Sequence, residues 1–365
     1  RFLMRCVSLA SGVLLASSLT VGAATTVSNP TSRLAKIAIP GHPLKAFDIG
    51  WVDPATARYY LADRSNAAVD IFDVTTNEAV GQIAGFKGFT GNNDTSGPDG
   101  VVVTFSGHEL WAGDGDSTVK VIDLARGSIV ASVSTGGKAR ADELAYDPQH
   151  QLILVANDAD DPPYLSFISV GSRQVLKKVA FPDATDGLEQ PVYDSATGMF
   201  YQAVPATTAH EGGEVAVLDP TSMSVTARYP LSDCSPHGLT TGPAGTNQLL
   251  AGCSKAHRST IIDKTNGAVL ADFDQTGGSD EVWFNAGDNR YYLAENAAQT
   301  LGVIDATSMA FVENVETGLG AHSVAADSVS NHVFVPVAAP DPACPRGCIA
   351  VFASTLGDRG DQPRQ

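Results

Sequence analysis

The hydrophobic and polar positions of this 365-residue chain follow a pattern that repeats seven times. Each repeat has a short apolar run, a turn rich in Gly, Asp, Asn or Pro, and a second run that is almost wholly apolar, as in "FDIGWVDPATARYYLAD" (47–63). A third run follows and ends in a turn such as "VIDLARG" (121–127), where an Asp stands at the first turn position. Short apolar runs between turn residues predict β-strands, and few stretches have the period of a helix. The chain is therefore predicted to be all-β.

The spacing of the repeats predicts the architecture. The first run of each repeat carries one ionisable residue, and these residues recur at intervals of 41 to 51 positions: Asp48, Asp99, Asp142, Glu189, His237, Glu281 and His322. Four-stranded propeller blades have this period, and seven blades is a usual number. The last repeat stops after its third run near Ser354, so residues 32–41 are expected to supply its fourth strand. The prediction is a seven-bladed β-propeller with four-stranded blades, the last one closed by an N-terminal strand.

The second runs carry a family resemblance. The segments "YYLAD" (59–63), "LVAND" (154–158) and "YYLAEN" (291–296) resemble the second strands of YVTN-type, surface-layer-like seven-bladed propellers. That family is close to the amine-dehydrogenase-like and nitrous-oxide-reductase-like propeller superfamily. The resemblance covers about residues 32–354, although a strict Y-V-T-N does not occur. It implies the architecture more than an activity, because propellers of this kind have diverse functions.

The N-terminus has the pattern of a secretory signal peptide. Arg1 and Arg5 precede an apolar stretch from Cys6 to Val21, and small residues follow at Ala23 and Ala24. Three parts are predicted: a signal peptide at 1–24, one propeller domain at 25–354 and a polar tail at 355–365. An exported protein, periplasmic or secreted, is expected, without a stable membrane anchor after cleavage.

Four cysteines remain after this cleavage, and an even number in an oxidising compartment predicts disulfides. The expected pairs are Cys234 with Cys253 and Cys344 with Cys348. The second pair has the spacing C-x-x-x-C, which lacks the C-x-x-C-H of covalent haem attachment. No glycine-rich phosphate-binding motif occurs, so neither haem nor a nucleotide is expected as cofactor.

The formal charge of −17 makes nucleic acid an unsuitable partner and favours cations or small neutral ligands. In a propeller the first strand of each blade lines the central channel, and the loop after the second strand returns to the same face. The seven ionisable residues are therefore expected at one channel mouth. The loops add further charged residues there: Asp63, Arg64, Asp158, His210, His257, Arg258 and Glu295.

Four of the channel residues stand on neighbouring blades and form a candidate metal site: Glu189, His237, Glu281 and His322. Crowded carboxylates raise one another's pKa or recruit a cation. A divalent ion is expected, with Ca²⁺, Mg²⁺ or Mn²⁺ favoured if the carboxylates dominate and Zn²⁺ or Cu²⁺ if the histidines do. A purely organic cation is an alternative, and so is a water-filled channel without chemistry.

Three functions stay open at this point. The first is binding of a divalent metal, a small ligand or both at the channel mouth. The second is a metal-dependent lyase or hydrolase, lactonase-like, in which Glu189, Glu281 or His237 acts as base and Arg258 or Arg64 holds an anionic group. The third is a scaffold that binds a protein partner without catalysis.

Overall fold

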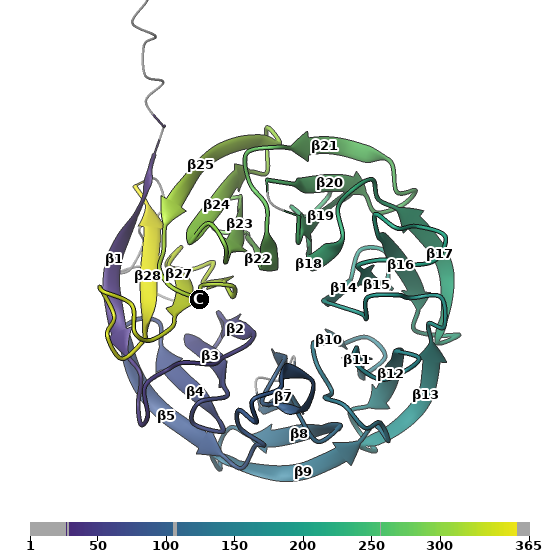
Figure 1. The fold of residues 1–365 in the computed structure, drawn as a ribbon, viewed down its shortest axis with the longest axis horizontal. Helices are drawn as coiled ribbons and strands as arrows, with labels where there is room; N and C mark the ends of the chain where they lie inside the picture. Colours follow the sequence, from purple (N-terminus) through teal and green to yellow (C-terminus); the bar gives the residue numbers. More distant parts are fainter. Residues whose placement is uncertain (1–26, 28, 105–107, 256, 356–365) are drawn as a thin grey trace, which may run out of the picture.

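The computed structural model describes residues 27, 29–104, 108–255 and 257–355, which form seven four-stranded antiparallel sheets arranged as a ring (Figure 1). The predicted all-β, seven-bladed propeller is confirmed. The predicted signal peptide and nearly all of the predicted tail lie outside the described residues. No helix in the described part of the chain is long and apolar enough to cross a membrane.

Six blades are each built from four consecutive strands. Blades one to three are β2–β5 (Gly50–Asp53, Arg58–Asp63, Ala68–Asp73, Glu78–Ala84), β6–β9 (Val101–Val103, Glu109–Asp114, Thr118–Asp123, Ser128–Ser134) and β10–β13 (Leu144–Asp147, Leu152–Asn157, Tyr164–Ser169, Gln174–Ala180). Blades four to six are β14–β17 (Pro191–Asp194, Met199–Val204, Glu214–Asp219, Ser224–Pro230), β18–β21 (Pro236–Thr241, Gln248–Cys253, Ser259–Asp263, Val269–Phe273) and β22–β25 (Ser279–Asn285, Arg290–Glu295, Thr300–Asp305, Ala310–Glu316). A short 3₁₀ helix, η1 (Asn93–Thr95), precedes β6.

The seventh blade joins the two ends of the described chain. Its inner strands are β26 (Ala325–Ala326), β27 (Val333–Val337) and β28 (Cys348–Ser354), and β1 (Thr31–Ala38) lies outermost (Figure 1). β1 pairs antiparallel with β28, with Ala38 opposite Cys348. This pairing uses the backbone groups of a strand edge that would otherwise stay open.

The apolar pattern follows from the position of each strand in its blade. The second strands, such as β11, are buried along their whole length because neighbouring blades cover both faces. The outer strands, such as β13, keep exposed residues and read as more polar. The recurring Asp holds the turn between third and fourth strands, as Asp123 does by accepting the amide hydrogen of Arg126 at 2.9 Å.

Both predicted disulfides are present, Cys234–Cys253 and Cys344–Cys348. Cys234 and Cys253 are fully buried and separated by 19 positions, whereas the other two cysteines are separated by 4. Replacing the first pair with alanines is expected to lower the free energy of unfolding by about 3 kcal/mol, because the unfolded chain regains the entropy of a long loop. Urea denaturation measures this. The matched pair of changes at Cys344 and Cys348 should cost about 1 kcal/mol less, and equal costs would contradict the loop-length argument.

Candidate functional site

One residue of each blade occupies the same position at the inner end of the ring, and backbone hydrogen bonds define it. The amide nitrogens of Asp99 and Asp142 donate to carbonyl oxygens on the second strand of their own blade, those of Gly113 and Ala156. The next residue along the chain donates to the following blade, as Gly100 does to the carbonyl oxygen of Asp142 at 3.1 Å. These bonds make the equivalent residues identifiable without reference to sequence spacing.

In the sixth blade this position belongs to Asp280, not to the predicted Glu281. The amide nitrogen of Glu281 donates to the carbonyl oxygen of His322 at 3.0 Å, as that of Gly100 does to Asp142. Glu281 is therefore equivalent to Gly100, one residue past the position in question. We call the corrected set the channel ring: Asp48, Asp99, Asp142, Glu189, His237, Asp280 and His322.

β-bulges explain why the channel position of blade six is Asp280 and not the next residue, Glu281. The register between the first two strands shifts between Pro236 and Gly238 in blade five, and between Ser279 and Val282 in blade six. The unpaired residues of a bulge change the direction of their side chains. The sequence contains a signal that indicates Asp280: it precedes Trp283 by three positions, just as Asp48 precedes Trp51 in blade one.

The channel ring surrounds a cavity of about 600 Å³, which we call the ring cavity. Six of its seven members line the cavity, and the seventh, Asp99, is fully buried beside Arg64. Arg64, Arg140 and Lys45 contribute positive charge to the same lining. The cavity is therefore polar, with carboxylates, imidazoles and guanidinium groups facing one another.

The first three blades neutralise their carboxylates internally. The Arg64 guanidinium donates from Nη2 to Asp48 Oδ2 at 2.5 Å and also to Asp99. Burial raises the pKa of Asp99, and the neighbouring guanidinium groups of Arg64 and Arg140 oppose that rise. These acids therefore have a counter-charge within the protein.

Arg140 is a second cation that the sequence analysis missed. Its Nη2 lies 2.8 Å from Asp142 Oδ2 and 2.9 Å from Asp158 Oδ2. The residue stands two positions before Asp142, in the segment that precedes the first strand of its blade and not in a loop after a second strand. The crowded acids of blades one to three therefore have cations of the protein beside them, Arg64 and Arg140, and do not depend on a recruited ion.

The remaining acids face the two histidines. His237 Nδ1 lies 3.4 Å from Glu189 Oε1 and 3.6 Å from Asp280 Oδ1. Burial works against the charged imidazole, but the contact with Asp280 and the charge of Glu189 outweigh it and raise the pKa of His237 to about 9. Burial raises the pKa of Glu189 to about 8, whereas the contact with His237 holds that of Asp280 below its usual value despite burial.

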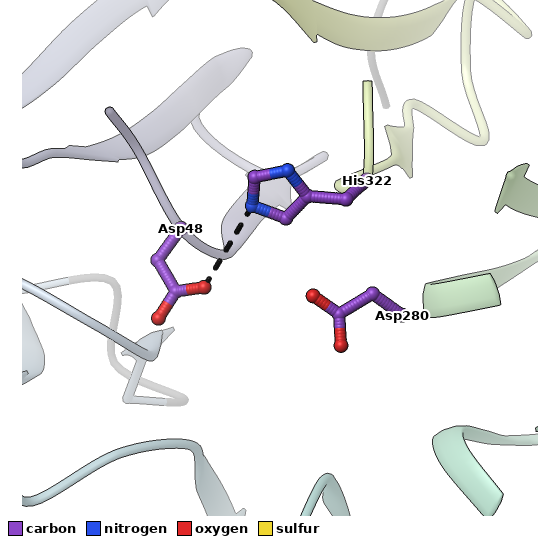
Figure 2. Close-up of side chains that lie close together, drawn as sticks. All are labelled: Asp48, Asp280 and His322. Atoms are coloured by element: carbon purple, nitrogen blue, oxygen red, sulfur yellow. Dashed lines mark ion pairs between the residues drawn. The ribbon is translucent and has the colours of Figure 1, made fainter. Parts of the chain in front are cut away.

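Figure 2 shows His322 with one ring nitrogen directed toward the carboxylate of Asp48 and the carboxylate of Asp280 lying close by. Its Nδ1 lies 2.7 Å from the carbonyl oxygen of Gly320, and its ring stacks on Phe47 with centroids 4.4 Å apart. Nε2 lies 3.9 Å from Asp48 Oδ1. One possible ligand atom from each of Asp48, Asp280 and His322 lies within 4.8 Å of the others. A hydrogen bond from Nδ1 to a carbonyl leaves the Nε2 lone pair available to an ion.

Comparison with known proteins agrees with this architecture. No family model matches the chain. The chain is 25% identical over 250 residues to an uncharacterized protein, YncE, from Salmonella typhimurium, an alignment that covers 66% of this chain and 69% of the relative. YncE from Salmonella typhi matches to the same extent. Among solved structures, hydrazine synthase of Kuenenia stuttgartiensis superposes with a TM-score of 0.60 at 18% identity, over 71% of this chain and 83% of that chain.

The chain has the seven-bladed β-propeller fold, which its own seven sheets show and the superposition agrees with. The architecture implied by the resemblance drawn from the repeats is thereby confirmed. The likeness to hydrazine synthase concerns the fold alone, because the sequence identity is low. The activity of this propeller has to be argued from its own site.

Two predicted residues of blade five do not line the ring cavity of this propeller. Arg258 donates from Nη2 to the carbonyl oxygen of Ser232 at 3.1 Å and lies 3.3 Å from Asp272. His257 is exposed and has a positive φ of 57°. The expectation that Arg258 holds an anionic ligand beside His237 is therefore not met by the geometry.

Three other predicted loop residues have structural partners instead. The side chain of Asp63 accepts from Asn66, and His210 Nδ1 lies 2.5 Å from Glu214 Oε2. Glu295 accepts from the amide nitrogen of Gly277 at 2.8 Å. None of the three lines the ring cavity, so their charges are used to hold loops and blades together.

The contacts of His237 predict a pH-dependent contribution to stability. Its pKa in the folded propeller, about 9, lies above the ordinary 6.5 of an unfolded histidine. The contribution is therefore complete below pH 6.5 and is lost as the pH rises through 9. Changing His237 to Gln should cost up to about 3 kcal/mol more at pH 6 than at pH 9.5. Urea denaturation of both proteins across this range measures it, and a cost that does not change with pH would contradict it.

Proposed function

We propose that this propeller binds a divalent metal ion through Asp48, Asp280 and His322. The observation that carries the proposal is the convergence of the three ligand atoms within 4.8 Å, with His322 already oriented by Gly320. Asp48 uses Oδ2 for Arg64 and directs Oδ1 toward His322. His322 and Asp48 therefore each have a partner that positions them, as the ligands of protein metal sites commonly do.

The donor set favours some ions over others. Ca²⁺ and Mg²⁺ prefer sites made of oxygen ligands only, whereas an imidazole nitrogen suits Zn²⁺, Mn²⁺ or Cu²⁺ when carboxylates accompany it. Three protein ligands leave coordination positions for another molecule. We therefore expect Zn²⁺ or Mn²⁺ rather than Ca²⁺.

The cavity leaves room for a small ligand beside the ion. At about 600 Å³ it has the size of pockets that hold small molecules. A carbonyl or carboxylate oxygen on the ligand would complete the coordination of the ion, and Glu189 and His237 stand on the opposite side of Asp280. The 3.4 Å contact between those two residues favours a second candidate, metal-assisted lyase or hydrolase chemistry with Glu189 as base.

We place this function outside the cytoplasm, in the periplasm or as a secreted protein. The pattern of residues 1–24 and the two disulfides support export. The net charge of −17 suits cation binding in such a compartment.

Calorimetric titration of EDTA-treated protein with Zn²⁺, Mn²⁺ and Ca²⁺ tests the proposal. We expect one equivalent of Zn²⁺ or Mn²⁺ to bind, and at a hundredfold excess over Kd the ion should stabilise the fold by about 2.7 kcal/mol. Turnover of small esters or lactones by the loaded protein would support the catalytic candidate. The absence of stoichiometric binding by all three ions would contradict the metal site and favour a protein-binding scaffold.

A further inference from the structure

Three side chains from blades four, five and six form a second group of possible metal ligands in the ring cavity. One ligand atom from each of Glu189, His237 and Asp280 lies within 4.8 Å of the others. The proposed metal site at Asp48 and His322 has the same composition, two carboxylates and one imidazole, and it also includes Asp280. The ring cavity therefore contains two sets of ligands that share one carboxylate.

The distances within this second group fit ligands around a metal ion. His237 Nδ1 lies 3.4 Å from Glu189 Oε1 and 3.6 Å from Asp280 Oδ1. Ligands that lie about 2.0–2.2 Å from a tetrahedral ion are about 3.3–3.6 Å from one another. Both distances therefore match edges of such a tetrahedron.

Two other histidine–carboxylate pairs of this propeller are much closer. His150 Nδ1 lies 2.6 Å from Asp147 Oδ2, and His210 Nδ1 lies 2.5 Å from Glu214 Oε2. These are the distances of direct hydrogen bonds, which leave no room for an ion between the two atoms. The wider spacing at His237 sets it apart from these two structural pairs.

The carboxylates of the second group are available to an ion. Apart from their contacts with His237, no hydrogen bond or ion pair joins the side chain of Glu189 or Asp280 to another described residue. The side chains of Glu189, His237 and Asp280 are 17%, 26% and 34% exposed, and all three line the ring cavity. An ion in this cavity can therefore reach them without a rearrangement of the blades.

We propose that Glu189, His237 and Asp280 bind a second divalent ion, and that the Asp280 carboxylate bridges it to the first. This inference rests on the proposed metal site, which it extends to a pair of ions. A carboxylate has two oxygens and can serve two ions, which lie about 3.5–4 Å apart in two-metal sites. Because both groups combine one imidazole with two carboxylates, we expect Zn²⁺ or Mn²⁺ at both positions.

The two ions are expected to bind one after the other. The first takes the site at Asp48 and His322, because Arg64 and Gly320 already position these two ligands. Its charge repels a second ion nearby. The second equivalent should therefore bind at least tenfold more weakly, and Glu189 then serves as a ligand and not as a free base.

Calorimetric titration with Mn²⁺, continued well beyond one equivalent, tests the second site on protein freed of metal by EDTA and then dialysed. We expect two binding events. Glu189→Gln and His237→Gln should each weaken the second event about a hundredfold or more and leave the affinity of the first within about threefold. Asp280→Asn should weaken both events.

Electron paramagnetic resonance of protein loaded with two equivalents of Mn²⁺ tests the bridge. Ions that share a carboxylate are magnetically coupled, so we expect the spectrum of a coupled pair. The Glu189→Gln protein at the same loading should give the spectrum of isolated ions.

His150→Gln is the matched control, because His150 also contacts a carboxylate but does not line the ring cavity. It should leave both binding events and the coupled spectrum unchanged. Thermal denaturation checks that every variant is folded, and Glu189→Gln keeps the test decisive if His237→Gln disturbs the fold.

The possible failures are distinguishable. A single binding event that Asp48→Asn abolishes, and that neither Glu189→Gln nor His237→Gln affects, would overturn the second site and leave the proposed metal site intact. Two events with the spectrum of isolated ions would overturn the bridge. The absence of any binding event would contradict the proposed metal site and the pair together.

Discussion

Replacing Arg140 with Met is expected to lower the free energy of unfolding by about 3–5 kcal/mol at pH 7.5. The guanidinium lies 2.8 Å from Asp142 Oδ2 and 2.9 Å from Asp158 Oδ2, and its Nη1 lies 3.9 Å from both Asp48 Oδ2 and Asp99 Oδ1. Met fills a similar volume but carries no charge. The variant therefore leaves Arg64 as the remaining guanidinium beside these buried carboxylates. Removing one partner of a buried ion pair is strongly destabilising, because the other charge stays buried without compensation.

Urea denaturation measures this effect, and Arg126→Met is its control. The Arg126 side chain is 75% exposed and lies 3.5 Å from Asp123, so its replacement should change stability by less than about 0.5 kcal/mol. The deficit of the Arg140 variant should shrink as the pH falls, because the carboxyl groups that lost their counter-charge take up protons. A cost no larger than that of Arg126→Met would show that the buried acids are already neutral in the folded propeller.

Changing Asp280 to Asn is expected to weaken binding of Zn²⁺ or Mn²⁺ by about a hundredfold or more, since even residues behind a ligand affect metal affinity 10- to 100-fold. The amide keeps the size of the side chain and removes the charged oxygen that faces His322 and Asp48. The neighbouring change Glu281→Gln should leave metal affinity within about threefold, because the Glu281 carboxylate is buried and accepts hydrogen bonds from Ser323 and Val324.

The comparison of these two variants tests the corrected position directly. Each is titrated with the metal after EDTA treatment, and thermal denaturation confirms that both are folded. Loss of metal binding in the Glu281 variant with retention in the Asp280 variant would support the position predicted from sequence spacing. Equal, small effects in both would contradict a site at the channel ring.

The sequence by itself determined the architecture of this protein. The seven repeats, with turn residues such as Asp123 at matching places, specify strands and turns through local chain geometry that needs no knowledge of distant contacts. The pairing of Cys234 with Cys253 followed from the same hairpin pattern, because the start of one strand lies beside the end of the next. Most of the channel ring could be found for the same reason, since the repeat places equivalent residues at equivalent points.

Only the tertiary structure decided how the side chains meet in the channel. A β-bulge in blade six turns Asp280 toward His322 and Glu281 toward Ser323 and Val324 of blade seven, and spacing alone does not reveal a bulge of this kind. Arg140 reaches Asp158 although 18 positions separate them, because two segments of neighbouring loops are packed together. Whether a charged residue is paired, exposed or available to a ligand depends on partners from other blades. Those partners come together only when the ring of seven blades is complete.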